Sequence, residues 1–231
     1  MTLRSQYYEE SLYPLQDGVL DLMRRSDTDF FLTGGTAISR AYYNHRYSDD
    51  LDFFVTQSSP DSFDAQTNKI LNMLKSEGYT WDTVNNFLRS ERFVSLSIYK
   101  ESNTLLKLDF INDSVPRFGS LVRTDLFHRT DCVRNILSNK LSAIFRFEAK
   151  DIADIREITL NNNVDWVETI RETREKDEGI ELVYVAEILK SFPRHEFDKI
   201  AWVKEVKWET FQNDIDKIAF DMLNAFSIHP T

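Results

Sequence analysis

Two short groups of residues, close together in the chain, carry side chains that could do chemistry. The first is Thr-Gly-Gly-Thr at residues 33–36, which follows an apolar run, and the second is Asp-Leu-Asp at residues 50–52. Gly34 and Gly35 let the backbone approach a ligand closely, and the free amides of a helix that begins near Thr36 would point at an anion. The first group therefore predicts a cradle for a phosphate chain such as a triphosphate.

The second group places two carboxylates on one face of a strand. Residues two apart in a strand point to the same side, so Asp50 and Asp52 project together while Leu51 and Phe53 enter the core. Two carboxylates held this way repel each other in a low dielectric unless a cation lies between them. Mg²⁺ takes hard oxygen ligands and is commonly held by one or two carboxylates plus substrate phosphates. The pair therefore predicts a magnesium site beside the phosphate cradle.

Each group also has a simpler interpretation when it is taken alone. Two glycines after a strand are often just a tight turn, and an Asp-x-Asp pair is often a solvated strand edge. Asp49 should point away from Asp50 and Asp52 and is expected to be solvated. The order strand, Gly-Gly, helix and acidic strand favours the functional interpretation, because it puts carboxylates inside an otherwise apolar strand.

The elements expected around these groups form an α+β scaffold. Apolar spacing predicts a helix over residues 5–26, and Gly78 predicts the end of a helix that starts near residues 58–61. The remaining elements expected up to residue 111 are strand 29–33, helix 35–44, strand 50–55 and strands 79–84, 91–99 and 104–111, with a turn at Ser102-Asn103 between the last two.

A third carboxylate, Asp109, lies on the last of these strands. That strand can lie beside the strand of Asp50 and Asp52, so the three side chains are expected to converge. Beyond Asp113 the apolar residues recur at helical spacing. The helices expected there cover residues 133–145, 152–160, 164–176, 179–192, 195–202 and 208–226.

These residues resemble the AbiEii/AbiGii-type toxins of abortive-infection systems, a branch of the DNA polymerase β-like nucleotidyltransferase superfamily. The likeness runs from Gly-Gly-Thr-Ala at residues 34–37 through the segment 45–54 to Asp109, and then to Lys-Leu-Ser-Ala at 140–143 and Lys-Asp-Ile-Ala-Asp at 150–154. The resemblance implies a polymerase β-like mixed sheet flanked by helices, followed by a helical C-terminal part. We therefore expect a nucleotidyltransferase core domain over residues 1–120 and a helical domain over residues 121–231 that completes the active site.

The resemblance also implies transfer of a nucleoside monophosphate from an NTP to an acceptor, with two Mg²⁺ ions stabilising the attacking and leaving oxygens. Asp50, Asp52 and Asp109 would bind the metals, and Asp109 would help to deprotonate the acceptor. Lys140 would neutralise charge on the triphosphate. The residues expected to bind the NTP are Gly34, Gly35, Thr36, Arg46, Ser48 and Lys140.

Several neighbouring residues keep more than one interpretation. Arg46 either reaches the γ-phosphate or anchors its loop through a carboxylate, and His45 beside it is expected to be structural. Asp151 and Asp154 lie three apart on a helix and so share a face. The resemblance places one of them in the active site, as a catalytic residue that positions Lys140 or acts as a base, and the sequence does not choose between them.

Composition limits the class of protein. The chain has 231 residues, of which 42% are hydrophobic, so one large or two small domains are expected. No run approaches the roughly 20 apolar residues of a membrane span, and the N-terminal residues carry no apolar signal region. We expect a cytoplasmic protein. Cys132, the lone cysteine, is expected to be a helix residue without a chemical role.

Charge is distributed unevenly along the chain. The formal net charge is −10, which argues against non-specific nucleic-acid binding by the whole surface. The segment 117–150 nevertheless contains seven Lys and Arg residues and three Asp and Glu residues, a balance of 7 − 3 = +4. These cations either lie on solvated helix faces or meet a triphosphate and an RNA or protein acceptor.

Three functions remain open from the sequence. The first is a toxin-type enzyme that adds nucleotides to RNA, such as a tRNA 3′ end, and is opposed by an antitoxin; the resemblance supplies that acceptor and that partner. The second is a nucleotidyltransferase that modifies a small molecule, such as an aminoglycoside, or a protein side chain. The third is a binding module without catalysis, which the intact Asp50, Asp52, Asp109 and Lys140 argue against.

Overall fold

The computed structural model describes residues 2–56, 60–101 and 104–228, and their contacts divide the chain into two compact units. Unit 1 comprises Met1–Tyr42, Tyr47–Ser114 and Leu121–Asp131, and unit 2 comprises Tyr43–Arg46, Val115–Ser120 and Cys132–Thr231. The chain therefore passes between the units several times. A single domain boundary at residues 120/121 stays a prediction.

Unit 1 is built on a five-stranded mixed sheet with the strand order β1-β2-β5-β4-β3. Strands β2 and β5 are parallel, and the other neighbouring strands are antiparallel. The bounds are β1 Phe31–Thr33, β2 Leu51–Val55, β3 Phe87–Arg89, β4 Phe93–Ile98 and β5 Leu106–Asn112. The predicted strands 29–33, 50–55, 91–99 and 104–111 are confirmed within a few residues.

Alternation of apolar and polar residues explains why β2 and β5 form neighbouring strands inside the sheet. On β5, Leu106, Leu108 and Phe110 are fully buried, whereas Lys107 between them is exposed. Aromatic rings pack between the two strands as well: Phe110 stacks on its strand partner Phe53 of β2, with the ring centroids 5.5 Å apart. Burial of these side chains fixes the register, because a slip by one residue would turn them to the other face.

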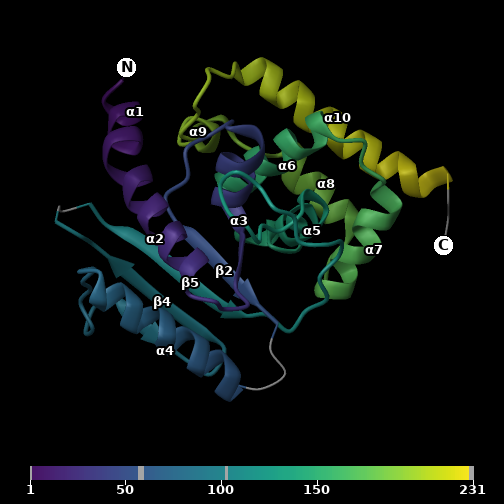
Figure 1. The fold of residues 1–231 in the computed structure, drawn as a ribbon. Coiled ribbons are helices and arrows are strands. Elements are labelled where there is room, and N and C mark those ends of the chain that lie inside the picture. The colour runs from purple at the N-terminus through teal and green to yellow at the C-terminus, as the bar shows by residue number, and fades with distance from the viewer. Residues whose placement is uncertain (1, 57–59, 102–103, 229–231) are drawn as a thin grey trace. The chain divides into compact units, whose positions relative to one another are not determined.

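Helices accompany the sheet in unit 1 (Figure 1). The predicted helix 5–26 appears as consecutive helical segments, α1 Leu3–Tyr7, a π-helical segment η1 Tyr8–Leu12 and α2 Tyr13–Arg25. Pro14 is accepted in the first turn of α2, where its missing N–H costs little. Helix α4, Pro60–Ser76, packs on the sheet through Phe63, whose ring lies 6.0 Å from that of Phe30. The proposed helix start at Ser58 and Ser59, and the turn at Ser102-Asn103, lie outside the described residues.

The predicted strand 79–84 is wrong. Thr80 makes only an isolated bridge with Tyr99, and the chain then turns. The turn is set by Asp82, whose Oδ1 accepts hydrogen bonds from the amides of Val84 at 2.8 Å and Asn85 at 3.2 Å. This Asx-type turn competes with an extended strand, so the edge strand β3 begins only at Phe87.

Unit 2 is helical, as expected for the C-terminal part of the chain. Its helices are α5 Val133–Ser142, a short 3₁₀ segment η3 Ile144–Arg146, α6 Ala149–Asn161, α7 Trp166–Lys176, α8 Leu182–Lys190, α9 Arg194–Phe197 and α10 Trp208–Ile228. The predicted helix 195–202 is too long, because Trp202 pairs with Arg46 in an antiparallel bridge. No helix in the described part of the chain has the length and apolar character needed to cross a membrane.

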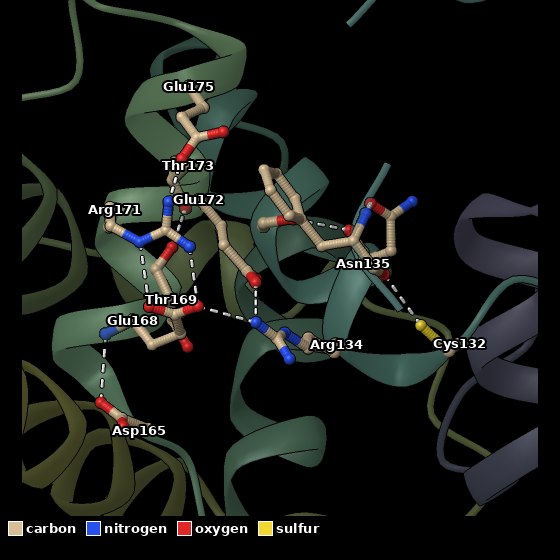
Figure 2. A network of polar contacts seen from close by, with 12 residues as sticks. Cys132, Arg134, Asn135, Asp165, Glu168, Thr169, Arg171, Glu172, Thr173 and Glu175 are labelled. Atoms are coloured by element: carbon tan, nitrogen blue, oxygen red, sulfur yellow. Dashed lines mark hydrogen bonds and ion pairs between the residues drawn. The ribbon is translucent and has the colours of Figure 1, made fainter. Parts of the chain in front are cut away.

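Ion pairs join α5 to α7 at one side of unit 2, as Figure 2 shows. Arg134 on α5 donates to Glu168 at 2.9 Å and to the fully buried Glu172, both on α7. On the same helix, the guanidinium of Arg171 donates to Oε1 of Glu168 at 2.7 Å. Asp165 caps the start of α7, because its Oδ1 accepts a hydrogen bond from the backbone amide of Glu168 at 3.1 Å. Because Glu172 is fully buried, loss of Arg134 would leave its carboxylate without this charged partner in the interior, which is costly.

Candidate active site

The glycine pair lies where β1 ends and a helix starts. The helix consists of α3, Gly34–Thr36, and a π-helical segment η2, Ala37–Tyr43. Gly34 has a φ of +71°, a conformation that favours glycine, and a Cβ placed on it would collide with the carboxylate of Asp52. Glycine is therefore required at residue 34 so that the helix start can lie against Asp52.

Two threonines fix the ends of this glycine turn. The hydroxyl of Thr33 donates to Oδ2 of the buried Asp131 at 2.8 Å, so it is turned away from the helix amides. Thr36 donates its hydroxyl to the backbone carbonyl of Asp50. The second contact joins the helix start directly to the acidic strand, although it uses the Thr36 hydroxyl that was expected to hold phosphate.

The residues just before β2 are anchored by the N-terminal helix. Ser48 is buried, and its carbonyl accepts a hydrogen bond from Gln16 at 3.0 Å. Gln16 also accepts from Arg40 at 2.9 Å. Asp49 is exposed and accepts a hydrogen bond from Tyr8 at 2.6 Å. These contacts hold the approach to the acidic strand in one position.

The structure brings the three predicted carboxylates to one region of the sheet. Asp52 on β2 and Asp109 on β5 are direct partners across the parallel pair. Asp50, which immediately precedes β2, is two residues from Asp52 and shares its side of the sheet. Asp50 and Asp52 are half-buried, whereas Asp109 is buried. The carboxylates therefore gather beside the glycine turn.

Both oxygens of Asp109 are already engaged by neighbours on the sheet. Ser95 on β4 donates to Oδ1 at 2.5 Å, and Lys107 Nζ donates to Oδ2 at 2.6 Å. Burial lowers the pKa of Lys107, but the hydrogen bond to Asp109 and the charges of Asp109, Asp50 and Asp52 raise it more, so its pKa lies above the ordinary value. Lys107 thus stands among all three carboxylates.

The fit of a divalent metal follows from these contacts. Carboxylate oxygens are the donors that Mg²⁺ prefers, and Asp52 beside Asp109 provides two of them. As the side chains stand, however, no three His, Cys, Asp or Glu side chains within residues 2–56, 60–101 and 104–228 are arranged to hold a metal ion. The arrangement is that of an acidic cluster closed by a lysine rather than of a formed metal site.

The remaining predicted site residues meet in a second, buried cluster within unit 2. Lys140 near the end of α5 contacts Oδ1 of Asp151 at 2.6 Å and Oδ2 of Asp154 at 2.7 Å, both on α6. Asp151 and Asp154 share one face of that helix, as their spacing predicts. Lys140 is therefore positioned by both carboxylates.

Arg46 and His45 complete this second cluster. Arg46 binds Asp154 with two parallel hydrogen bonds of 2.7 Å, and His45 Nε2 lies 2.9 Å from the same carboxylate. Arg146 binds Asp151 at 2.7 Å from a side chain that is 54% exposed. Asp154 thus contacts Arg46, His45 and Lys140, all of them buried, whereas one partner of Asp151 is the exposed Arg146.

Electrostatics hold the cluster in its charged form. Burial raises the pKa of Asp154, but the charges of Arg46 and Lys140 and the bond to His45 lower it more, so its pKa lies well below the ordinary value. The pKa of Asp151 is lowered for the same kind of reason, by Lys140 and Arg146 against the effect of burial. Buried charges of this kind need all their partners, because one left unpaired is costly.

Sequence reasoning assigned no role to Lys107, Ser95 or Asp131. A signal for Lys107 exists, because it lies two residues before Asp109 on an alternating strand and must share its face. Ser95 and Asp131 are brought in by strand pairing and by a contact 98 residues away in the chain, and neither leaves a local signal.

The basic segment 117–150 is largely neutralised within the protein. At least four of its seven cations form ion pairs with carboxylates that lie outside the segment. These four cations are Arg129, Arg134, Lys140 and Arg146. The local charge balance of the sequence therefore does not become an equally positive surface.

Comparison with known proteins identifies the family. Residues 21–226 match the family model described as nucleotidyl transferase AbiEii toxin, type IV toxin–antitoxin system. The chain belongs to the AbiEii family. The protein is thus a nucleotidyltransferase, and the description of AbiEii as the toxin of a type IV toxin–antitoxin system applies to its family. A search of curated protein sequences finds no significant match.

Solved structures show the same fold at low sequence identity. MenT4, a nucleotidyltransferase toxin from Mycobacterium tuberculosis H37Rv, is 15% identical with a TM-score of 0.64, over 92% of this chain and 82% of that one. JHP933 from Helicobacter pylori is 18% identical with a TM-score of 0.60, over 94% of this chain and 92% of that one. The predicted polymerase β-like nucleotidyltransferase fold is confirmed.

Proposed function

We propose that this AbiEii-family enzyme transfers a nucleoside monophosphate from an NTP to RNA, with a tRNA 3′ end as the acceptor, in a Mg²⁺-dependent reaction. The observation that supports this most is the placement of Asp52 against both Asp109, its strand partner, and Gly34 at the helix start. A glycine turn beside an acidic cluster suits an NTP, because helix amides bind phosphates and carboxylates act at the reacting phosphorus.

The reaction assigns a distinct role to each group. The acceptor hydroxyl oxygen attacks the α-phosphorus in line, the bond from that phosphorus to the β-phosphate bridging oxygen breaks, and pyrophosphate leaves. In the proposal Asp109 accepts the hydroxyl proton, and Gly34, Gly35, Thr36 and Ser48 hold the phosphates through their backbone or hydroxyl groups.

In the proposal, Lys140 is the residue of the second cluster that acts on the triphosphate. Lys140 neutralises phosphate charge, and Asp151 and Asp154 position it, because both carboxylates contact its ammonium group. Arg46 is engaged by Asp154 through two hydrogen bonds. This supports the anchoring role for Arg46 over a direct contact with the γ-phosphate.

A metal requirement is part of the proposal, with Asp50, Asp52 and Asp109 as the ligands of Mg²⁺, and with two ions as the expected number. Asp109 would first have to be released by Lys107, whose ammonium now binds one of its oxygens. A separately encoded antitoxin is the proposed partner, since the family description is that of a toxin–antitoxin system.

A second candidate is transfer to a small molecule or to a protein side chain. Two observations favour keeping it. The net charge is −10, and most cations of the segment 117–150 are paired with carboxylates of the protein. A polyanion such as RNA gains less from such a surface than from a strongly basic one.

One labelling experiment separates the candidates. Purified full-length protein, Mg²⁺ and each of the four α-³²P-labelled NTPs are incubated in turn with total RNA, total protein and a small-molecule fraction. The proposal predicts label in small RNA. Periodate-oxidised RNA is the matched control, because it lacks a 3′-terminal diol and should take up no label. If only protein or only small molecules became labelled, the acceptor would not be RNA, and the proposal would be wrong. If oxidised RNA became labelled as strongly as intact RNA, the 3′ end would be excluded as the site of transfer.

A further inference from the structure

Lys107 occupies a place among the carboxylates that the proposed reaction leaves unexplained. Strands β2 and β5 pair in parallel, with Leu51 opposite Leu108 and Asp52 opposite Asp109. Asp50 immediately precedes β2, and Lys107 lies two residues before Asp109 on β5, so each is one position before the printed pair of Leu51 and Leu108. Side chains two residues apart on a strand share a face, so Lys107 and Asp50 are expected on the same face of the sheet as the partners Asp109 and Asp52.

The contacts of Lys107 close this acidic cluster. Its ammonium lies 2.6 Å from Asp109 Oδ2, and Ser95 holds the other oxygen of Asp109 at 2.5 Å. The charges of Asp50 and Asp52 act on the same ammonium group. Within the described residues no three acidic or other metal-binding side chains are arranged around a metal position. The lysine therefore supplies the positive charge that the clustered carboxylates require.

The lysine is also placed so that it can leave. Its side chain is 45% exposed, whereas that of Asp109 is 13% exposed. A half-exposed ion pair contributes little stability, since water competes for both groups. The long flexible stem of a lysine lets the ammonium move to solvent without disturbing the strand. A divalent cation, with twice the charge, is a stronger partner for several carboxylates at once.

We propose that Lys107 is an internal counter-cation of the acidic cluster, which a divalent metal ion displaces when it binds Asp109 together with Asp52 and Asp50. The inference rests on the proposed metal requirement of the enzyme. Before metal binding the lysine neutralises the cluster, and afterwards its ammonium lies in solvent. Lys107 therefore weakens metal binding and is a positioning residue for Asp109.

The first test measures the affinity for Mn²⁺ alone, from the electron paramagnetic resonance signal of the free ion, with full-length protein. Lys107→Met removes the ammonium and keeps the stem, so Mn²⁺ should bind about fivefold more tightly than to the wild type, the scale of a half-exposed ion pair. Lys69→Met is the matched control, because Lys69 lies in unit 1, its ammonium donates to the Asp27 carbonyl at 3.5 Å rather than to a carboxylate of the acidic cluster, and its replacement changes net charge equally. It should leave the affinity unchanged.

The second test follows the lysine itself in the wild type. Acylation of lysines by sulfosuccinimidyl acetate is quantified by mass spectrometry with and without Mn²⁺, and Lys107 is compared with Lys69. Release from Asp109 should raise the labelling rate of Lys107 several-fold, and Lys69 should not respond. Asp52→Asn, which removes a proposed ligand, should abolish the rise.

The outcomes separate the inference from the proposed function. Mn²⁺ binding by the wild type, with unchanged labelling of Lys107 and no gain in Lys107→Met, overturns the inference and leaves the metal requirement intact. No Mn²⁺ binding by any of the proteins overturns both. A gain that is equal in Lys107→Met and Lys69→Met also overturns the inference, since net charge would then explain it.

Discussion

Among single residues, Gly34 lies so close to Asp52 that a Cβ at residue 34 would overlap the Asp52 carboxylate. The sequence predicts that Gly34 lets the backbone approach a ligand closely, and in the structure Gly34 lies against a carboxylate of the acidic strand. Its φ of +71° adds a second reason for glycine. The glycine turn and the acidic pair, two separate motifs in the sequence, therefore form one contact.

Replacement of Gly34 by alanine should damage activity more than stability. The new Cβ would displace the Asp52 carboxylate, and misplacement of a reacting group by about 1 Å costs on the order of 10²-fold in rate. Gly78→Ala is the matched control, because Gly78 has a φ of +83° and open space around it. Both variants should lose about 1–2 kcal/mol of unfolding free energy from backbone strain.

Two measurements check this prediction, the rate of label transfer from an α-labelled NTP and the urea unfolding free energy of each variant. Only Gly34→Ala should lose transfer activity. Equal activity of the two alanine variants would show that the contact between residue 34 and Asp52 has no bearing on catalysis.

At the scale of elements, helices α5 and α6 are joined by buried charge. Lys140 and Arg46 both contact Asp154, which is fully buried, so the helices are held by ion pairs as well as by apolar packing. The pKa of Asp154 is lowered and the pKa of Lys140 is raised in the folded protein. Because the folded-state pKa of Asp154 is lowered, the stability that its carboxylate contributes is fully present above its unfolded pKa and is lost as pH falls toward the folded pKa. Stability from the lysine is present below its unfolded pKa and disappears as pH rises.

Asp154→Asn should therefore destabilise the protein in a pH-dependent way. At pH 7 the loss should be about 3–5 kcal/mol, because buried cations lose their partner. At pH 3, about 0.8 units below the unfolded pKa of 3.8, the difference from the wild type should shrink by about 1 kcal/mol, because unfolded Asp154 is then protonated. Urea unfolding at both pH values measures it.

The control for this prediction is Asp216→Asn, on an exposed position of α10 in the same unit. Its effect should be small at both pH values. A difference between wild type and Asp154→Asn that stays constant from pH 7 to pH 3 would mean that Asp154 is not held ionised by its neighbours.

The sequence predicts elements where the apolar pattern acts alone, and it fails where a side-chain hydrogen bond or a distant pairing outweighs that pattern. Alternation on β2 and β5 predicted that Asp50, Asp52 and Asp109 share one face. The turn set by Asp82 and the bridge between Trp202 and Arg46 defeated the predicted strand 79–84 and helix 195–202. For strand 79–84, a short-range hydrogen bond from the Asp82 side chain outweighed the apolar pattern. For helix 195–202, a pairing with a residue far away in the chain, Arg46, did so.

In the candidate site, too, some features could be predicted from the sequence and others could not. Residue types and spacing identified the carboxylates, the glycines and Lys140, and these all lie in the two clusters described. The engagement of Asp109 by Ser95, and of Arg46 by Asp154, depends on strand register and on contacts far apart in the chain, about which motif spacing carries no information. Lys107 shares the face of Asp109 by simple alternation, so that partner could have been predicted, although its hydrogen bond to Asp109 could not.

In the whole molecule, each of the two units is built from several separate segments of the chain. Residues Tyr43–Arg46 belong to unit 2, although they lie between two parts of unit 1, and Leu121–Asp131 belongs to unit 1. Within unit 1 Thr33 depends on Asp131, and within unit 2 Arg46 depends on Asp154. Neither unit is therefore a continuous piece of sequence.

A fragment of residues 1–120, cut at the predicted boundary, should not fold stably. It would lack Asp131, which binds the Thr33 hydroxyl, and Asp154, which binds Arg46. A cost of about 1–3 kcal/mol for each buried polar group left without its partner is large against the 5–15 kcal/mol of a typical domain. Circular dichroism during heating measures it. A cooperative unfolding transition in the fragment, comparable to that of the full chain, would contradict this prediction and support a boundary at 120/121.

The central claim is that the acidic cluster beside the glycine turn performs nucleotidyl transfer. The most direct test compares Asp52→Asn with Asp49→Asn in transfer of label from an α-³²P NTP to RNA, with both proteins at wild-type fold by circular dichroism. Asp49 is the adjacent acid, exposed and bound to Tyr8, so it controls for the loss of one charge. Asp52→Asn should lose transfer activity on the order of 10²-fold or more, and Asp49→Asn should keep a near wild-type rate. Equal rates in the two variants would contradict the central claim.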